Sequence, residues 1–268
     1  MKIRLPAVAG RFYEAKPELL KKEIEAYLIP GLSKEPAIAA VSPHAGYMYS
    51  GHVAGAVYSR LLIPNKVVIL GPNHTGLGAP AAIMVDGQWQ MPLGPVPIAE
   101  DLAREILAQS RILEEDVEAH LYEHSLEVQV PFLQYLNPRL AIVPICLSAL
   151  PLEAIEDIGL ALAKALASYP EPVLLVASTD MSHYVPHEVA KQKDALAIEK
   201  ILALDHVGLL EVVHRERISM CGVYPTAATI VAARTLGAQE GELVKYATSG
   251  EVSGDFYQVV GYAGIIIR

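Results

Sequence analysis

Two histidines in this 268-residue sequence share one local setting and are the first candidates for chemistry. His44 lies in Ser-Pro-His-Ala-Gly-Tyr at residues 42–47, and His74 lies in Gly-Pro-Asn-His-Thr-Gly at residues 71–76. An apolar run precedes each loop, so each histidine is predicted to follow the carboxyl end of a buried strand, where open α/β sheets build their sites. A lone histidine of this kind usually hydrogen bonds within its loop. The recurrence instead favours two neutral imidazoles that meet in one crevice.

A third polar loop follows the apolar run at residues 173–177 and contains Asp180 and His183. A carboxylate three residues from a histidine in a tight loop can orient the imidazole, which then exchanges protons near neutral pH. The alternative is that Asp180 caps the turn while His183 lies on the surface. We predict that Asp180 and His183 form a catalytic acid/base pair, and the capping alternative stays open.

Of the two cysteines, Cys221 is the candidate for chemistry. It precedes a helix that Pro225 is expected to open, where amide donors and the helix dipole favour a thiolate that binds a metal or acts as a nucleophile. The alternative is a small buried apolar residue, which suits Cys146 better because Cys146 lies inside an apolar strand. No signal peptide or transit sequence is predicted, so the expected location is the reducing cytoplasm, where a disulfide is disfavoured.

Residues 120–124 read His-Leu-Tyr-Glu-His and match the H-x-x-E-H signature of inverted zinc proteases. That hypothesis needs His120 and His124 on one face of a helix, which is predicted for residues 120–136, and a third zinc ligand downstream that is not evident. A zinc metallopeptidase is therefore the least favoured function. On the same predicted helix, His124 and Glu127 lie one turn apart, and we expect both to line the crevice as substrate-binding residues.

Strands and helices alternate along the whole chain, without a repeat, a low-complexity tract or a linker. We therefore predict one α/β domain over residues 1–268, with a mostly parallel central sheet covered by helices on both faces. The apolar runs typical of doubly covered parallel strands are residues 67–70, 141–145, 173–177 and 259–267. The predicted helices span residues 17–28, 50–62, 99–109, 120–136, 151–168, 187–204, 206–214 and 225–235.

Composition excludes several function classes. The chain has 30 acidic and 21 basic residues without a Lys/Arg cluster, which argues against a nucleic-acid or anionic-membrane partner. No apolar run approaches the roughly 18 residues of a membrane-spanning helix. Neither histidine loop matches a Walker A or a G-x-G-x-x-G motif, so no phosphate cradle is indicated. The expected ligand is a small molecule or a peptide.

Taken together, these motifs resemble the Memo family, whose prokaryotic members are also called AmmeMemoRadiSam system protein B. The resemblance extends over essentially the whole chain, with the motifs in the family's order. The resembling segments are residues 6–13, 42–47, 71–74, 123–127, 178–183, 221–222 and 259–262.

The Memo family is in turn similar in fold to class III, LigB-type extradiol dioxygenases, which are non-haem iron enzymes that cleave catechol rings. By that resemblance His44 and His74 match the two histidine metal ligands, and His183 matches the acid/base histidine. Cys221 takes the place of the carboxylate ligand. The resemblance implies a divalent metal, with iron favoured and copper or zinc as alternatives because a thiolate changes metal preference.

Two classes of function follow from the resemblance. The first is a metal-dependent redox enzyme that acts on a small phenolic or related substrate, with Tyr47, Asn73 and His124 lining its pocket. The second is a non-catalytic peptide- or protein-binding module that retains a dioxygenase-like crevice, because eukaryotic Memo proteins resemble signalling adaptors. The prokaryotic name implies AMMECR-type and radical-SAM proteins as partners.

Overall fold

The fold is built on a mixed sheet of nine strands, seen in a computed structural model that describes residues 2–268. In space the strands follow the order β10-β12-β2-β9-β3-β8-β4-β7, and β11 pairs with β12 beside this path. In chain order they are β2 (Ala39–Ser42), β3 (Lys66–Pro72), β4 (Ala81–Ile83), β7 (Glu114–Glu115), β8 (Ala141–Leu147), β9 (Val173–Ser178), β10 (His183–Val185), β11 (Gly241–Thr248) and β12 (Val259–Ile267).

The four central strands β2, β9, β3 and β8 run parallel and are buried on both faces. Val68 of β3, for example, pairs with Leu175 of β9 on one side and with Val143 of β8 on the other. Helices cover both faces of these strands, so every side chain position favours an apolar residue. The predicted α/β architecture with a doubly covered central sheet is confirmed.

The prediction of a parallel strand over residues 259–267 is wrong in one respect. The strand exists as β12, but it runs antiparallel to both β2 and β11. Residues 249–258, which include the short helix α9 (Gly250–Ser253), join β11 to β12, and this connection is too short for a parallel crossover. The apolar run indicates only that the strand is buried on both faces, and a strand of either direction can be buried in this way.

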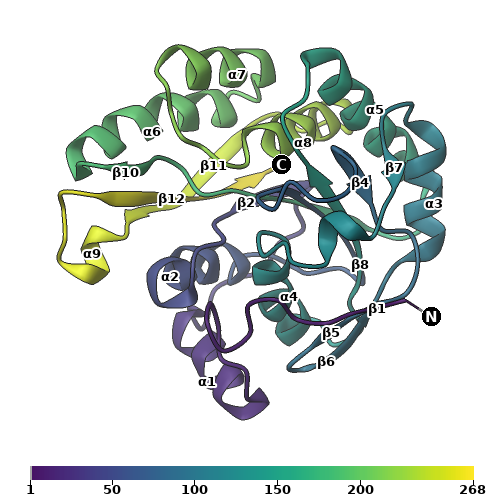
Figure 1. Cartoon of the computed structure of the whole chain (residues 1–268), viewed down its shortest axis with the longest axis horizontal. Coiled ribbons are helices and arrows are strands. Elements are labelled where there is room, and N and C mark those ends of the chain that lie inside the picture. Colours follow the sequence, from purple (N-terminus) through teal and green to yellow (C-terminus); the bar gives the residue numbers. More distant parts are fainter. Residues whose placement is uncertain (1) are drawn as a thin grey trace.

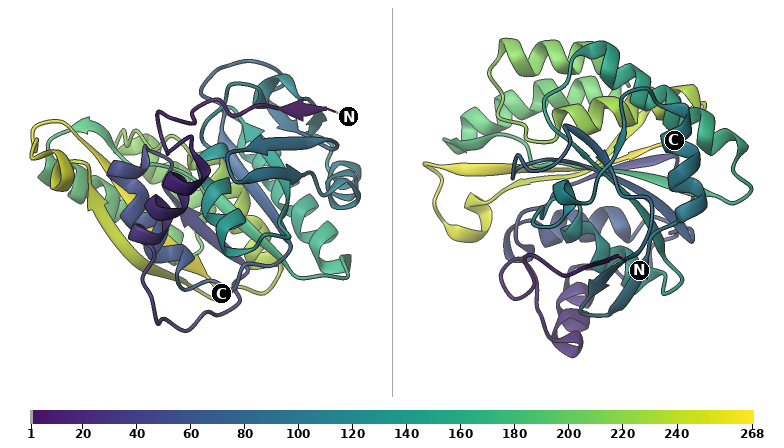
Figure 2. Two further views of the ribbon diagram at one scale, coloured as in Figure 1. Left: turned by 90° about the horizontal axis from the view of Figure 1, so that it is seen from below. Right: turned by 45° about the vertical axis from the view of Figure 1, so that its right-hand side comes forward.

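Helices form a layer on each side of the sheet (Figures 1 and 2). Figure 1 shows α5 (Leu152–Ser168), α6 (His187–Leu202), α7 (His206–Arg215) and α8 (Val223–Thr235) above the sheet. Below it lie α1 (Pro17–Tyr27), α2 (Tyr47–Tyr58) and α4 (Val130–Leu136), while α3 (Glu100–Gln109) packs beside α5. Among the described helices, none is long and apolar enough to cross a membrane.

A smaller sheet fastens the N-terminal segment to the body of the protein. Its three strands are β1 (Ile3–Arg4), β5 (Gln88–Met91) and β6 (Gly94–Pro97), in the order β1-β5-β6. The prolines of β6 are tolerated because this strand lies at the edge, where a missing N–H interrupts no ladder. The guanidinium of Arg4 is fully buried and lies 4.3 Å from the ring of Trp89, so the segment is a packed part of the fold.

The single helix predicted for residues 120–136 is wrong in its first half. Two short 3₁₀ helices, η1 (Glu118–His120) and η2 (Glu127–Gln129), precede α4, and a loop connects them. Pro131 marks the true start of α4, because proline is accepted in a first helical turn and not in a helix interior. We call residues 118–129 the connecting loop; its polar side chains bond to distant segments instead of following a helical ladder.

The parallel strands bring three polar loops to one edge of the sheet. Ser42, the last residue of β2, pairs with Ser178, the last residue of β9, and β3 lies on the other side of β9. The loops that follow these strands therefore begin side by side, although they are far apart in the sequence. This edge is the carboxyl edge at which open α/β sheets bind ligands.

Candidate metal centre and cavity

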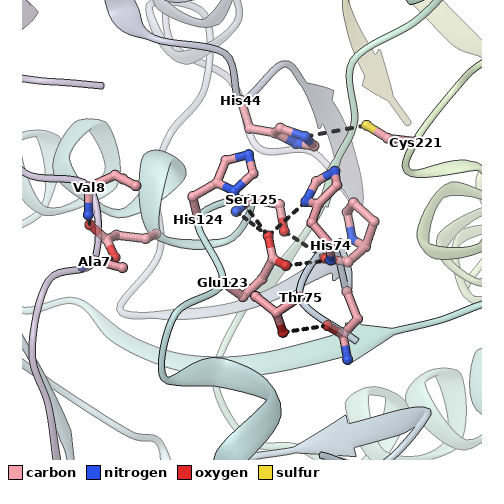
Figure 3. A network of polar contacts seen from close by, with 12 residues as sticks. Ala7, Val8, His44, His74, Thr75, Glu123, His124, Ser125 and Cys221 are labelled. Carbon is pink, nitrogen blue, oxygen red and sulfur yellow. Dashed lines mark hydrogen bonds and ion pairs between the residues drawn. The ribbon is translucent and has the colours of Figure 1, made fainter. Parts of the chain in front are cut away.

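Three predicted metal ligands meet at the carboxyl edge of the sheet. His44 follows β2, His74 follows β3, and Cys221 directly precedes α8. Their ligand atoms all lie within 4.8 Å of one another. Nε2 of His44 lies 3.3 Å from Sγ of Cys221, a contact drawn as a dashed line in Figure 3. The two imidazole ring centroids are 5.3 Å apart.

Hydrogen bonds fix the tautomer of His44. Its Nδ1 lies 2.9 Å from Oγ of Ser178, whose own proton is donated to the carbonyl of Ser125 and which also accepts a bond from Gln129 Nε2. The Ser178 oxygen is therefore an acceptor for His44, and the His44 proton resides on Nδ1. Burial, followed by the neighbouring His124, lowers the pKa of His44, so the ring is neutral with its Nε2 lone pair facing Cys221.

A carboxylate holds His74. Nδ1 of His74 lies 2.9 Å from Oε1 of Glu123, and the backbone N–H of His74 donates to Oε2 of the same carboxylate (Figure 3). Burial opposes ionisation of Glu123, but the bonds from His74 and from the Ser125 N–H outweigh it and lower the pKa of Glu123 to about 2. Because an ionised carboxylate only accepts, Nδ1 of His74 carries a proton, and Nε2 is the ring nitrogen left for a metal.

The thiol of Cys221 is not activated as the sequence predicts. Burial of the sulfur, followed by the nearby Asp180 carboxyl group, raises the pKa of Cys221 to about 12. The backbone N–H of Asp180 does donate to Sγ over 3.3 Å, but this bond is outweighed. Helix α8 begins at Val223, with Gly222 as its cap, so Cys221 lies outside the first turn, where the effect of the dipole falls off. Cys146 is fully buried, as expected.

Asp180 and His183 do not form the pair expected from their spacing. The carboxylate of Asp180 accepts the backbone N–H of His44 over 2.8 Å and so shapes the His44 loop. His183 is oriented by Ser219: Nδ1 lies 2.8 Å from the Ser219 carbonyl oxygen, and the His183 N–H donates to the Ser219 hydroxyl. A carbonyl can only accept, so Nδ1 of His183 is protonated and Nε2 is free to take up a proton.

The ligand group opens into a cavity of about 500 Å³, the size of a small-molecule site. His44, His74, His124 and His183 line it, together with Asp180. Its walls also carry the aromatic side chains of Phe12, Tyr49, Tyr184 and Tyr262 and, among ionised groups, those of Arg11 and Asp255. The lining therefore combines aromatic rings with imidazole, carboxyl and guanidinium groups.

His124 lies inside this cavity, as predicted, although the connecting loop and not a helix places it there. Its ring stacks on His74 with centroids 4.6 Å apart and an interplanar angle of 19°. Phe12, from the N-terminal segment, packs against the same ring at 4.9 Å. Burial lowers the pKa of His124, so this imidazole is a neutral part of the wall.

Tyr47 and Asn73 lie elsewhere than expected. Tyr47 is buried in the interior, where its hydroxyl donates to the carbonyl of Val128 and its ring packs against Phe132. The amide of Asn73 closes its own loop by donating to the carbonyl of Leu77. Both residues therefore support the segments that carry His44 and His74, and neither belongs to the cavity lining.

Glu127 is also internal. It forms a fully buried ion pair with Arg4 and accepts bonds from the backbone N–H groups of Ala7 and Val8 and from the hydroxyl of Tyr13. The carboxylate therefore fastens the N-terminal segment to the connecting loop. Arg4 adds bonds to the carbonyls of two further loop residues.

The zinc-peptidase hypothesis finds no geometric support. His120 is fully buried beside Trp89, with ring centroids 6.2 Å apart, and His124 faces the cavity. Within residues 2–268, neither ring nitrogen of His120 has a hydrogen-bond partner. The two histidines do not share a helical face, because the helix that would align them does not form there.

Sequence reasoning gave no role to Glu123, Ser178 or Phe12. Glu123 stands next to His124 in the sequence, but its partner His74 lies 49 residues away, so no local spacing marks the contact. Ser178 ends a strand that pairs with β2, a signal that becomes available only once the strand order is known. Phe12 reaches the cavity through the path of the N-terminal segment.

Comparisons with known proteins agree with this architecture. Residues 4–266 match the family model described as Memo-like protein. A MEMO1 family protein of Methanopyrus kandleri is 47% identical, with 99% of each chain covered. A MEMO1 family protein of Pyrobaculum aerophilum is 45% identical, again with 99% of each chain covered. The crystal structure of an uncharacterized protein from Escherichia coli K12 matches this chain with a TM-score of 0.54 and 15% sequence identity. The match covers 84% of this chain and 98% of that chain, and it shows a likeness of fold.

Proposed function

The chain belongs to the Memo family, and from this premise we propose that it is a metal-dependent redox enzyme of the dioxygenase-like kind, acting on a small phenolic or related substrate. The observation that carries the proposal is the convergence of the ligand atoms of His44, His74 and Cys221 within 4.8 Å of one another, with both histidines in the lining of a cavity. Three protein ligands with further positions open toward a cavity are typical of a catalytic metal site.

The residues present fit a divalent transition metal. Both imidazoles direct Nδ1 at a hydrogen-bond acceptor, so Nε2 is the nitrogen of His44 and of His74 that is available to a metal. Cys221 releases its proton when a metal binds, which makes binding dependent on pH. Two nitrogens and one sulfur accommodate iron, copper or zinc, and we favour iron. A bound metal of this kind supplies Lewis acidity and, for iron or copper, electron transfer.

His183 is the proposed acid/base. Its ring lines the cavity, and its Nδ1–H is fixed on the Ser219 carbonyl, so Nε2 can accept a proton from a phenolic hydroxyl and return it later in the cycle. Asp180 acts on the other side of the site, where it holds the backbone of the His44 loop. The two residues predicted as one pair thus have separate tasks.

The cavity supports a small aromatic substrate. A volume of about 500 Å³ admits a substituted phenol. The rings of Tyr49 and Tyr262, which belong to its lining, supply flat apolar surfaces against which an aromatic ring packs. His124 and Phe12 complete the wall on the side of the connecting loop. Two free cysteines, one of them the proposed ligand Cys221, suit a reducing compartment, and we propose the cytoplasm.

A peptide- or protein-binding module is the second candidate, and the rim of the cavity favours it. Tyr184 lines the cavity yet is 73% exposed, and Met48, which also belongs to the lining, is 60% exposed. Apolar side chains so exposed at a mouth offer contacts to a ligand larger than the cavity. AMMECR-type or radical-SAM proteins remain the proposed partners under either function, on family resemblance alone.

Elemental analysis of anaerobically purified protein tests the proposal. We expect about one iron, copper or zinc per chain in the wild type and none in His44→Ala or Cys221→Ser. Oxygen consumption with catechol as the probe then tests redox turnover of the loaded protein. A wild type that stays metal-free after reconstitution with each ion would overturn the enzyme proposal and favour the binding module. That module would bind its partner equally well as wild type or as His44→Ala.

A further inference from the structure

We propose that Glu123 is the positioning residue of the metal centre, which holds His74 in the one tautomer and orientation that ligates a metal. This inference rests on the proposed function, because it concerns how the same three ligands are prepared. It assigns a task to a residue that is absent from the cavity lining and is not one of the three proposed ligands.

The carboxylate of Glu123 is matched to donors only. It accepts from Nδ1 and the backbone N–H of His74 and, over 2.8 Å, from the backbone N–H of Ser125. Because three donors surround the carboxylate, these hydrogen bonds are made by its ionised form, which carries no proton. The imidazole of His74 is consequently held as the Nδ1–H form, and its Nε2 lone pair is directed toward the ligand atoms of His44 and Cys221.

The carboxylate is itself held rigidly. The side chain of Glu123 is 1% exposed, and its backbone carbonyl accepts a bond from the buried guanidinium of Arg4 over 2.6 Å. His74 is constrained on a second side by the ring of His124, which is nearly parallel to it (Figure 3). A ring fixed at Nδ1 and stacked on one face has little freedom to rotate away from its ligand position.

The Nδ1 groups of the two histidine ligands donate to different kinds of acceptor. His44 donates to the neutral hydroxyl of Ser178, whereas His74 donates to a buried carboxylate. A carboxylate partner pulls the Nδ1 proton more strongly than a hydroxyl and makes the opposite nitrogen a better donor to a metal. Glu123 therefore contributes to metal affinity through charge as well as through geometry.

Replacement of Glu123 by glutamine separates the effects of its charge and hydrogen bonds from the effect of its packing. In Glu123→Gln one oxygen becomes an NH₂ group, which cannot accept from the donors that face it. Either the amide turns its NH₂ toward Nδ1 of His74 and reverses the tautomer, or the backbone N–H of His74 loses its acceptor. Metal affinity is expected to fall 10- to 100-fold in either case.

The test measures Co²⁺ affinity by titration and the His74 tautomer in metal-free protein by ¹⁵N–¹H correlation spectra. Asp116→Asn is the matched control, because Asp116 is a carboxylate of the adjoining segment that accepts backbone N–H bonds from Ala79 and Ala119 without contacting a proposed ligand. We expect weaker Co²⁺ binding in Glu123→Gln together with either a reversed His74 tautomer or a shifted His74 backbone amide signal, and wild-type values in Asp116→Asn. Glu123→Asp keeps the charge and should recover part of the affinity.

Equal Co²⁺ affinity in Glu123→Gln and wild type, with His74 still protonated at Nδ1, would overturn the role of Glu123 while leaving the proposed function intact. An equal loss in Asp116→Asn would also overturn it, since the effect would then be a general loosening of the loop. A wild type that binds no Co²⁺ is a different result, because it removes the proposed function itself.

Discussion

Nδ1 of His183 lies 2.8 Å from the carbonyl oxygen of Ser219, so a backbone group and not a carboxylate orients the proposed acid/base. This partner cannot be removed by a side-chain substitution and does not titrate. Nδ1 of His183 is therefore held on a fixed acceptor, and Nε2 is the ring nitrogen left for proton exchange in the cavity.

His183→Ala is expected to remove proton transfer and to leave the metal in place. Catechol turnover should fall by roughly 10²- to 10⁴-fold, the usual contribution of a positioned acid/base. Metal content should equal that of the wild type, because His183 lies outside the ligand group of His44, His74 and Cys221. Turnover that survives the substitution would exclude His183 from the mechanism, and metal loss would make it a ligand.

Ser178→Ala is expected to weaken metal binding through His44. The substitution removes the acceptor of the His44 Nδ1 proton, so the Nε2–H tautomer becomes accessible and competes with ligation. We expect Co²⁺ affinity to fall by about tenfold. Ser59→Ala is the control, since this buried hydroxyl bonds to Gly55 and Ile29 away from the site. Co²⁺ titration that does not separate the two variants would contradict the assignment.

Breaking the buried ion pair between Arg4 and Glu127 should cost far more than breaking an exposed one. Glu127→Ala leaves a buried guanidinium without its carboxylate, and the free energy of unfolding should fall by about 3–5 kcal/mol in urea denaturation. The exposed pair of Arg60 and Glu242 is the comparison, and Glu242→Ala should cost less than about 1 kcal/mol. Similar losses in both variants would show that burial does not govern the Arg4 pair.

His120 should make the protein less stable in mild acid. Burial, followed by the charge of Arg4, lowers the pKa of His120 from 6.5 to about 3. Between pH 6.5 and pH 3, His120 is therefore protonated in the unfolded chain and neutral in the folded chain. Stability contributed by the neutral ring is present above pH 6.5 and is lost as the pH falls. Between pH 7 and pH 5 the loss is about 2 kcal/mol.

His120→Phe provides the comparison, because it removes the titrating ring while keeping an aromatic group beside Trp89. Between pH 7 and pH 5 the unfolding free energy of the wild type should fall by about 2 kcal/mol more than that of His120→Phe. Parallel pH profiles for the two proteins would contradict a buried, neutral His120.

Local patterns were sufficient for the elements that build the sheet edge. Apolar runs and proline positions predicted the strands β3, β8 and β9 and the helices α1 and α5, because burial and helix starts depend on neighbouring residues. The position of His44 and His74 after buried strands predicted that they meet, since parallel strands present their carboxyl ends at one edge. The family membership follows from the same motifs.

The sequence by itself thus determined the α/β class, the family and the meeting of His44 with His74, which follow from motifs, apolar runs and the shared edge of parallel strands. The place of Cys221 as a third ligand was implied by the family resemblance and not by periodicity. Tertiary structure decided the path of the connecting loop, the direction of β12 and the separate partners of Asp180 and His183. Those features depend on hydrogen bonds and packing between segments far apart in the chain. No periodicity within a segment encodes a partner that lies outside it.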